Sequence, residues 1–279
     1  MERIAVNVSK QHLRKVNQEI SFKAYANEIT VILSPDSSLI HSLILKMLKS
    51  KNTGVSYYEH KLEKQREYIL NFLGYMPSSL PSFKHMTIEE YFKYSAKFYQ
   101  GDYNNNNFEA LLNFFNLDKD LKIKVLSYEE KKIINFIDSI FFEPEVLILE
   151  DPFSNISNIN VVKIIKCITK LKDNGFSVIL TNLKYDELDI ADHIYLLTNQ
   201  GLSEFKKNKK NKISVSFEYD SNIEIKDFLN DIEAYDIIIT NNNVAFKYDG
   251  NINSLLTKLN KIKLNSLKIY PQDIYQLGV

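Results

Sequence analysis

The sequence predicts a large α/β domain with a mostly parallel sheet, followed by a small α+β domain. Three observations support this prediction. Short apolar runs, typical of buried strands, alternate with helical patterns over the first two hundred residues. A basic run at residues 205–212 interrupts that series. After it, the pattern changes to short alternating strands. We therefore expect domains at residues 1–204 and 213–279, joined by a linker at 205–212.

Four apolar runs predict the buried strands of the first domain, at residues 29–33, 146–149, 177–181 and 194–197. Apolar residues that recur at helical spacing lie between them, as Leu39, Leu43 and Met47 do after the first run. Similar patterns precede and follow the second run. This alternation predicts strands that run parallel and are covered on both faces.

A helical subdomain is expected at about residues 83–142. Thr87 and Glu90 have the spacing of a capping box, which predicts a helix start at Thr87. A second helix is expected over residues 108–115, after a polar loop at residues 104–107.

The second domain is expected to contain strands and helices in alternation. Residues 212–219 alternate like a strand, and residues 225–232 have a helical pattern. A pair of strands joined by an asparagine turn, a second helix and a last strand follow, at residues 236–240, 244–248, 252–262 and 266–270.

Composition excludes several classes of protein. The chain of 279 residues has 35 Lys plus Arg and 35 Asp plus Glu, so global charge predicts no nucleic-acid partner. One cysteine, Cys167, allows no disulfide within the chain, and its helical pattern indicates a packed apolar side chain. The five histidines show no metal-ligand spacing. No apolar run is long enough to span a membrane. Seven glycines are few against a usual share of ~7%, so few loops can follow a ligand closely.

Residues 27–43 form a predicted strand, loop and helix that resemble the Walker A segment of the ATP-binding subunit of ABC transporters, especially bacterial exporters with a small C-terminal domain. The family pattern is G-P-N-G-x-G-K-[ST]-T-L. The resemblance covers residues 1 to about 205 in order and implies an ABC-type ATPase fold. The loop residues that depart from the pattern stand for three glycines, the lysine and the magnesium-binding hydroxyl, and they are Ser34, Ser37, Leu39, Ile40 and His41.

These departures predict that no nucleotide or metal binds in this loop. Loop glycines let backbone N–H groups surround phosphates, and the lysine neutralises their charge. Losing one charge-assisted hydrogen bond of about 1.5–3 kcal/mol lowers affinity by roughly one to two orders of magnitude. Asp36 also adds a carboxylate where phosphate charge would lie. We favour the interpretation of this segment as an ordinary strand, turn and helix of the core.

Residues 126–132 stand where the family has the signature L-S-G-G-Q. Ser127 is retained, and the resemblance implies that it could contact ATP held by a partner subunit. Ser127 and Glu130 also have the spacing of a capping box, and two carboxylates would occupy the anion position. We favour the cap.

Residues 142–157 resemble the Walker B strand and the loop after it. The family has Asp-Glu-Pro where this chain has Glu150, Asp151 and Pro152. Glu150 and Asp151 are therefore weak candidates for catalysis, since Asp151 is one methylene group shorter than a glutamate base and geometry decides whether a base reaches the attacking water. Ser157 replaces an aspartate, and Asn182 replaces the switch histidine, which it cannot mimic. A simple strand end and turn is the alternative.

Residues 73–92 resemble the Q-loop and the start of the helical subdomain. Ser78 stands in place of the glutamine. The resemblance implies a surface that docks a transmembrane permease, with Ser78, Phe83, Met86 and Tyr91 as candidates. An ordinary aromatic helix packed on its neighbour remains the alternative.

The resemblance implies a catalytically inactive subunit that pairs with an active ABC ATPase subunit, as a hetero- or homodimer, and docks on a membrane permease. We expect it in the cytoplasm, on the inner face of the cell membrane, with ATP and magnesium supplied only through a partner. Two alternatives stay open. One is a soluble regulatory or scaffold module, derived from an ABC ATPase, that no longer takes part in transport. The other is a working ATPase with Glu150 on magnesium and Asp151 as base.

Overall fold

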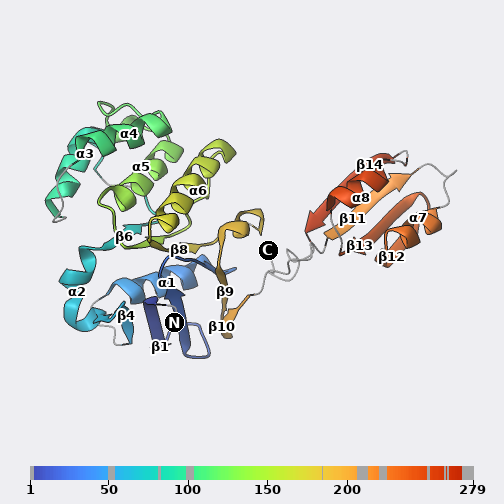
Figure 1. Ribbon diagram of the computed structural model, residues 1–279, viewed down its shortest axis with the longest axis horizontal. Helices are drawn as coiled ribbons and strands as arrows, with labels where there is room; N and C mark the ends of the chain where they lie inside the picture. The colour runs from blue at the N-terminus through green and yellow to red at the C-terminus, as the bar shows by residue number, and fades with distance from the viewer. Residues whose placement is uncertain are drawn as a thin grey trace. The chain divides into compact units, whose positions relative to one another are not determined.

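The computed structural model of the chain describes residues 3–49, 54–80, 83–98, 104–183, 185–205, 213–219, 225–249, 252–260, 262 and 264–271. The chain forms two compact units, Met1–Phe205 and Lys206–Val279, which we describe separately (Figure 1). The expected basic linker lies, after Phe205, outside the described residues.

A six-stranded sheet forms the centre of the first unit, in the order β10-β9-β3-β8-β7-β6. Five neighbouring strands run parallel, and only β10 is antiparallel to its neighbour. The strands are β3 (Ile29–Leu33), β6 (Leu73–Met76), β7 (Val146–Leu149), β8 (Ser177–Thr181), β9 (His193–Thr198) and β10 (Gly201–Glu204). The mostly parallel α/β sheet predicted from the sequence is confirmed, as are its four predicted strands.

A second, antiparallel sheet of the first unit was not predicted, and it has the order β2-β1-β4-β5. Its strands are β1 (Ile4–Gln11), β2 (Ile20–Tyr25), β4 (Val55–Tyr57) and β5 (His60–Lys61). These strands bury one face and expose the other, so they contain no continuous apolar run. A pattern of continuous apolar runs therefore does not reveal them.

Helices cover the central sheet. Those of the first unit are α1 (Ser37–Leu48), α2 (Leu62–Leu70), α3 (Ile88–Ser95), α4 (Asn105–Phe115), α5 (Tyr128–Phe141) and α6 (Asn158–Asp173). Short 3-10 turns occur at η1 (Ala96–Phe98), η2 (Ile123–Val125) and η3 (Tyr185–Ile190). No helix in the described part of the chain is long and apolar enough to cross a membrane.

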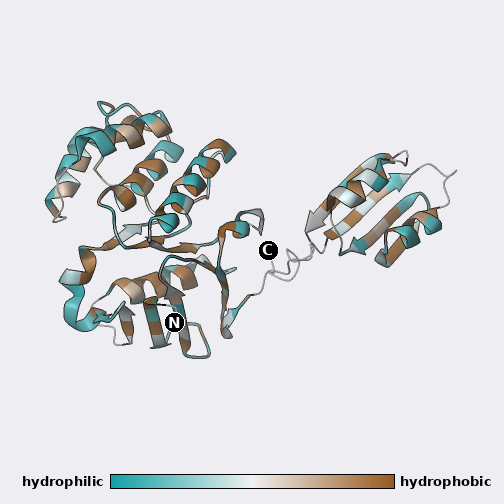
Figure 2. Cartoon of the chain, viewed as in Figure 1, coloured by the Kyte–Doolittle hydropathy of each residue, from teal (hydrophilic) through white to brown (hydrophobic). Residues whose placement is uncertain are grey.

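The two faces of the central sheet belong to two separate hydrophobic cores. Val31 and Leu147 pack with helices α5 and α6, whereas Ile32 and Ile148 pack with α1 and the antiparallel sheet. Side chains alternate between the faces because successive residues of a strand point to opposite sides. Apolar residues accordingly gather along the central strands and the helix faces turned toward them (Figure 2).

One predicted loop is wrong. Residues 105–107 begin helix α4, and only Asn104 precedes it, as the N-cap. The Asn104 side chain accepts a hydrogen bond of 3.1 Å from the backbone N–H of Asn107, which satisfies a donor that the helix start would leave unpaired. A run of asparagines therefore starts a helix here instead of forming a loop.

The second unit has the order strand, helix, two strands, helix, strand, with the sheet order β12-β13-β11-β14. All its neighbouring strands are antiparallel, which is the split βαβ arrangement. The elements are β11 (Ile213–Tyr219), α7 (Ile225–Asp231), β12 (Tyr235–Thr240), β13 (Asn243–Tyr248), α8 (Ile252–Leu259) and β14 (Leu264–Pro271). The predicted α+β composition of this region is confirmed.

Candidate functional site

The carboxyl ends of four neighbouring parallel strands, β3, β8, β7 and β6, meet at one edge of the central sheet. Ligands of open α/β sheets bind outside such ends. Ser34 follows β3, Asn182 follows β8, and Glu150 follows β7. The Asn182 side-chain oxygen accepts a hydrogen bond of 3.3 Å from the backbone N–H of Ser34. Asn182 thus ties two of these strand ends together.

Residues 34–41 form the turn after β3 and the first residues of α1. Asp36 is the N-cap, and its carboxylate accepts a hydrogen bond of 2.8 Å from the backbone N–H of Ser38. The hydrogen bonds from Ser38 lower the pKa of Asp36 below its usual value. Lys15 Nζ lies 3.8 Å from the Asp36 carboxylate and 3.5 Å from Ser38 Oγ. A negative side chain of the protein therefore occupies the position of an anion at this helix start.

Two residues in the first turn of α1 lie inside the hydrophobic core. Leu39 and Ile40, which the resemblance aligns with a glycine and the lysine of the family pattern, are 3% and 1% exposed. Both belong to α1 and pack with the antiparallel sheet. Ser37, by contrast, is exposed. Of Ser37, Leu39 and Ile40, the two buried residues have apolar side chains.

His41 and Glu150 meet directly. His41 Nδ1 donates to Glu150 Oε1 at 2.9 Å, and the Tyr75 hydroxyl donates to Glu150 Oε2 at 2.6 Å. Glu150 is only 4% exposed, so these bonds offset the cost of burying its charge. Burial, together with the bond to Glu150, raises the pKa of Tyr75. The structure thus joins two predicted site residues, His41 and Glu150, in one hydrogen-bonded cluster.

Asp151 lies in the turn after β7, where hydrogen bonds of its backbone hold it in place. Its φ of 51° is left-handed, and its N–H donates to Thr181 Oγ1 at 2.9 Å. Its carbonyl accepts a hydrogen bond from Lys132 Nζ, which also donates to Ser154 Oγ at 2.6 Å and to the Ser154 carbonyl at 3.1 Å. Burial lowers the pKa of Lys132. A fully buried ammonium group of α5 therefore fixes the turn that carries Asp151.

Ser127 caps α5, as its spacing to Glu130 predicts. Its hydroxyl accepts from the Glu130 N–H at 3.2 Å, and the Glu130 carboxylate accepts from the Ser127 N–H at 2.7 Å. Glu129 accepts hydrogen bonds from Ser157 N, Ser157 Oγ and Asn160 Nδ2, at 3.0, 2.6 and 2.6 Å. The bonds from Ser157, then that from Asn160, lower the pKa of Glu129. These contacts fasten the start of α5 to the start of α6.

The candidate docking residues differ in exposure. Tyr91 is 7% exposed, and its hydroxyl donates to Asp138 at 2.9 Å. Phe83 is 40% exposed and lies 5.6 Å from the Tyr91 ring, between ring centroids. Ser78 and Met86 are half-buried. Of the four, Phe83 is the one that presents a large apolar surface, and Tyr91 supports it from the core.

Sequence reasoning missed three residues that organise this region: Tyr75, Glu129 and Lys132. For Lys132 a signal was present, because it falls on the apolar face of α5 one turn before Phe136. A charged residue on a buried stripe needs a polar partner inside the protein. Tyr75 and Glu129 gave no such signal, because their partners are distant in sequence.

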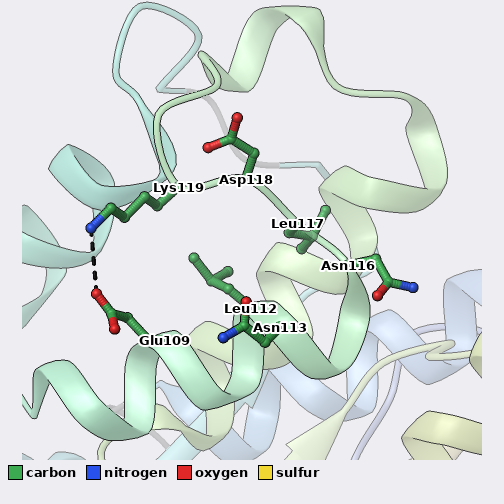
Figure 3. Close-up of a pocket in the computed structure, with 7 residues that line it drawn as sticks. All are labelled: Glu109, Leu112, Asn113, Asn116, Leu117, Asp118 and Lys119. Carbon is green, nitrogen blue, oxygen red and sulfur yellow. Dashed lines mark hydrogen bonds and ion pairs between the residues drawn. The ribbon is translucent and has the colours of Figure 1, made fainter.

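The described residues of the chain contain no group of three His, Cys, Asp or Glu side chains placed to hold a metal ion. A pocket of about 470 Å³ lies at the C-terminal end of α4. Leu112, Leu117 and their neighbours line it (Figure 3). Glu109 and Lys119 form an ion pair of 3.4 Å beside it. None of its lining residues belongs to the strand ends described above.

Comparison with known proteins gives relatives that are described as ABC transporter ATP-binding proteins. No protein-family model matches the chain. An uncharacterized ABC transporter ATP-binding protein, YhaQ of Bacillus subtilis, is 27% identical over 127 residues, which are 44% of this chain and 42% of YhaQ. A second uncharacterized ABC transporter ATP-binding protein, MJ1023 of Methanocaldococcus jannaschii, is 24% identical over 191 residues, 66% of this chain and 69% of the relative. The match to YhaQ thus spans less than half of that protein.

Solved structures show the same fold. The ATP-binding subunit of an ABC transporter matches 74% of this chain and 92% of its own, with a TM-score of 0.66 and 15% identity. The central sheet, the antiparallel sheet and the helical subdomain all lie within the first unit described above. In fold and in sequence similarity, this chain is an ABC ATP-binding-domain-like protein.

Proposed function

We propose that this chain is a catalytically inactive ABC-type subunit that pairs with an active ATPase subunit and docks on a membrane permease at the cytoplasmic face. ABC ATP-binding domains generally work as pairs together with a transmembrane permease. The observation that carries the proposal is the bond between His41 and the buried Glu150.

The residues at the strand ends do not fit a magnesium–nucleotide complex. Magnesium prefers oxygen ligands in octahedral geometry, but His41 offers a nitrogen. Both carboxylate oxygens of Glu150 already accept hydrogen bonds from His41 and Tyr75. Ile40 brings no charge to the position of the lysine, and Asp36 places a carboxylate at the start of α1. We therefore expect no ATP hydrolysis by this chain.

An exposed apolar surface supports the pairing with a second ATPase subunit. Val125, Tyr128, Ile159 and Val162 flank the bonded starts of α5 and α6 and are 61%, 44%, 74% and 51% exposed. Four large apolar side chains around one pair of helix starts are typical of a surface that another protein covers. We call this group the pairing surface.

A row of aromatic rings supports docking on a permease. The Phe83 ring lies 5.3 Å from that of Tyr94, which lies 5.1 Å from that of Phe98, between centroids. Phe98 is 68% exposed, which is costly in water for a side chain of this size. Phe83, Tyr94 and Phe98 form the aromatic surface of the helical subdomain.

Calorimetric titration of the full chain with MgATP tests whether the chain binds nucleotide. We expect no saturable binding up to roughly millimolar ATP, where the standard binding free energy falls to about −4 kcal/mol. Micromolar binding would contradict the proposal. A turnover assay completes the test, because hydrolysis that disappears in Asp151→Asn would identify a working ATPase.

Copurification from native membranes tests the two partners separately. We expect the tagged full chain to recover both a second ATPase subunit and a multi-span protein. Ile159→Asp, on the pairing surface, should lose the ATPase subunit, and Phe98→Asp, on the aromatic surface, should lose the multi-span protein. Recovery of a soluble partner alone would instead favour a regulatory module outside transport.

A further inference from the structure

The second unit exposes an apolar edge strand. Strand β12 lies at one edge of its sheet and pairs only with β13 among the described strands of that unit. Its sequence, Tyr-Asp-Ile-Ile-Ile-Thr, contains three consecutive isoleucines. Ile237, Ile238 and Ile239 are 40%, 62% and 38% exposed. An unpaired edge with β-branched apolar side chains is a template for another strand.

The isoleucines of β12 are exposed on both faces of the sheet, and this indicates how a partner would cover the strand. Successive residues of a strand point to opposite faces, so Ile238 lies on one face and its two neighbours on the other. Ile239 pairs with Val244, which is buried in the core beneath the helices, and Ile238 pairs with Ala245. A partner resting on one face would leave part of this apolar surface in water. A strand added at the edge continues both faces and covers all three isoleucines.

The opposite edge of the same sheet is protected. Strand β14 contains Lys268, which is exposed, and ends at Pro271. Charged side chains and proline are common devices against unwanted pairing at an edge. Strand β12 has neither lysine nor proline. Its charged residue, Asp236, has a left-handed φ of 51° and lies in the irregular pairing between Tyr235 and Ile238. The regular part of β12, from Ile238 to Thr240, remains available.

We propose that β12 pairs with β12 of a second copy of this chain, antiparallel and with Ile238 on the two-fold axis. The two-fold axis at Ile238 places the Asp236 residues of the two copies on opposite sides of the axis, so no two carboxylates oppose each other. The Asp236 carboxylate already pairs with Lys247 of its own chain at 2.6 Å. Self-pairing joins the two four-stranded sheets into one of eight strands. The contact uses the second unit alone, so it does not rest on the pairing proposed for the first.

Sedimentation of the full chain over a range of concentrations tests the proposal. We expect a dimer that Ile238→Lys weakens by at least ~tenfold, because two ammonium groups would then meet at the axis. The matched control is Leu267→Lys on β14, where Leu267 is 39% exposed, and it should leave the dissociation constant unchanged within about twofold. Circular dichroism verifies that both variants fold.

Cross-linking tests the register. In a Cys167→Ala background, Ile238→Cys should form an interchain disulfide on oxidation, since residues on the axis of an antiparallel pair have Cα atoms about 4.5–5.5 Å apart. Leu267→Cys should not. A monomer at concentrations on the order of 100 µM, or a dimer that Ile238→Lys and Leu267→Lys weaken equally, would overturn the proposal. A dimer without the Ile238→Cys disulfide would overturn the register.

Discussion

Individual buried charges organise the strand ends of the first unit. Glu150 is satisfied by His41 and Tyr75, and Lys132 by the turn that carries Asp151 and Ser154. A buried charge is tolerated only when hydrogen bonds replace its water. In both clusters the partners belong to this chain, so each charge is satisfied without a ligand.

Replacing Lys132 with methionine should destabilise the chain by about 2–4 kcal/mol. Methionine fills a similar volume but donates no hydrogen bond, so the carbonyl oxygens of Asp151 and Ser154 lose a buried donor. Chemical denaturation measures the free energy of unfolding. The control is Lys131→Met at the half-buried neighbouring position, which should change it by less than ~0.5 kcal/mol. Equal effects of the two substitutions would contradict the assigned role.

At the scale of elements, helices begin with caps supplied by the chain itself. Asp36, Thr87, Asn104 and Ser127 cap α1, α3, α4 and α5, respectively. A cap satisfies N–H groups that would otherwise bind an anion. The two helix starts that the family resemblance would give to phosphate, those of α1 and α5, therefore already have an internal acceptor.

The hydrogen bonds through which Glu129 links α5 to α6 should make the free energy of unfolding depend on pH. Hydrogen bonds from Ser157 and Asn160 lower the pKa of Glu129 below its usual 4.5 in the folded state. A carboxyl whose pKa is lower in the folded than in the unfolded state stabilises the fold above the unfolded value. That contribution is lost as pH falls through the folded value. Glu129→Gln should therefore reduce the loss of unfolding free energy on acidification below about pH 5.

Denaturation at several pH values between about 3 and 6 measures this effect. Glu63→Gln, at an exposed position in the first turn of α2, is the control and should leave the pH dependence unchanged. If Glu129→Gln and the original chain lose stability in parallel, the hydrogen bonds to Glu129 do not hold the two helices.

At the scale of the whole molecule, each unit has its own hydrophobic core. In the first unit, two clusters flank the central sheet, whereas the second unit packs Phe217, Phe246 and their neighbours beneath two helices. A separate core allows a unit to fold by itself. The two units should therefore unfold as separate transitions.

Calorimetry of the full chain should show two thermal transitions. Phe217→Ala, at a residue 2% exposed in the second unit, removes a large side chain at a cost of about 3–5 kcal/mol and should lower only one transition. Phe136→Ala, at a fully buried residue of α5, should lower only the other. A single transition that both substitutions shift would show that the units unfold together.

Local signals allowed much of the fold to be predicted from the sequence. The apolar runs of the central strands and the capping boxes at Thr87 and Ser127 each depend on residues close in the chain. The half-exposed strands β1 and β2 and the helix start at Asn104 were missed. Their signals are weak, because half the residues of such strands are polar and asparagine suits both loops and caps.

The sequence by itself determined the alternation of strands and helices and the absence of glycine and lysine from residues 34–41 after β3. Periodicity and residue type carry that information directly. Only the tertiary structure decided that His41 reaches Glu150 across 109 positions and that Lys132 holds the turn at Asp151. It also left the isoleucines of β12 at an edge. Such contacts join residues far apart in the chain, and no local pattern encodes which strand ends become neighbours.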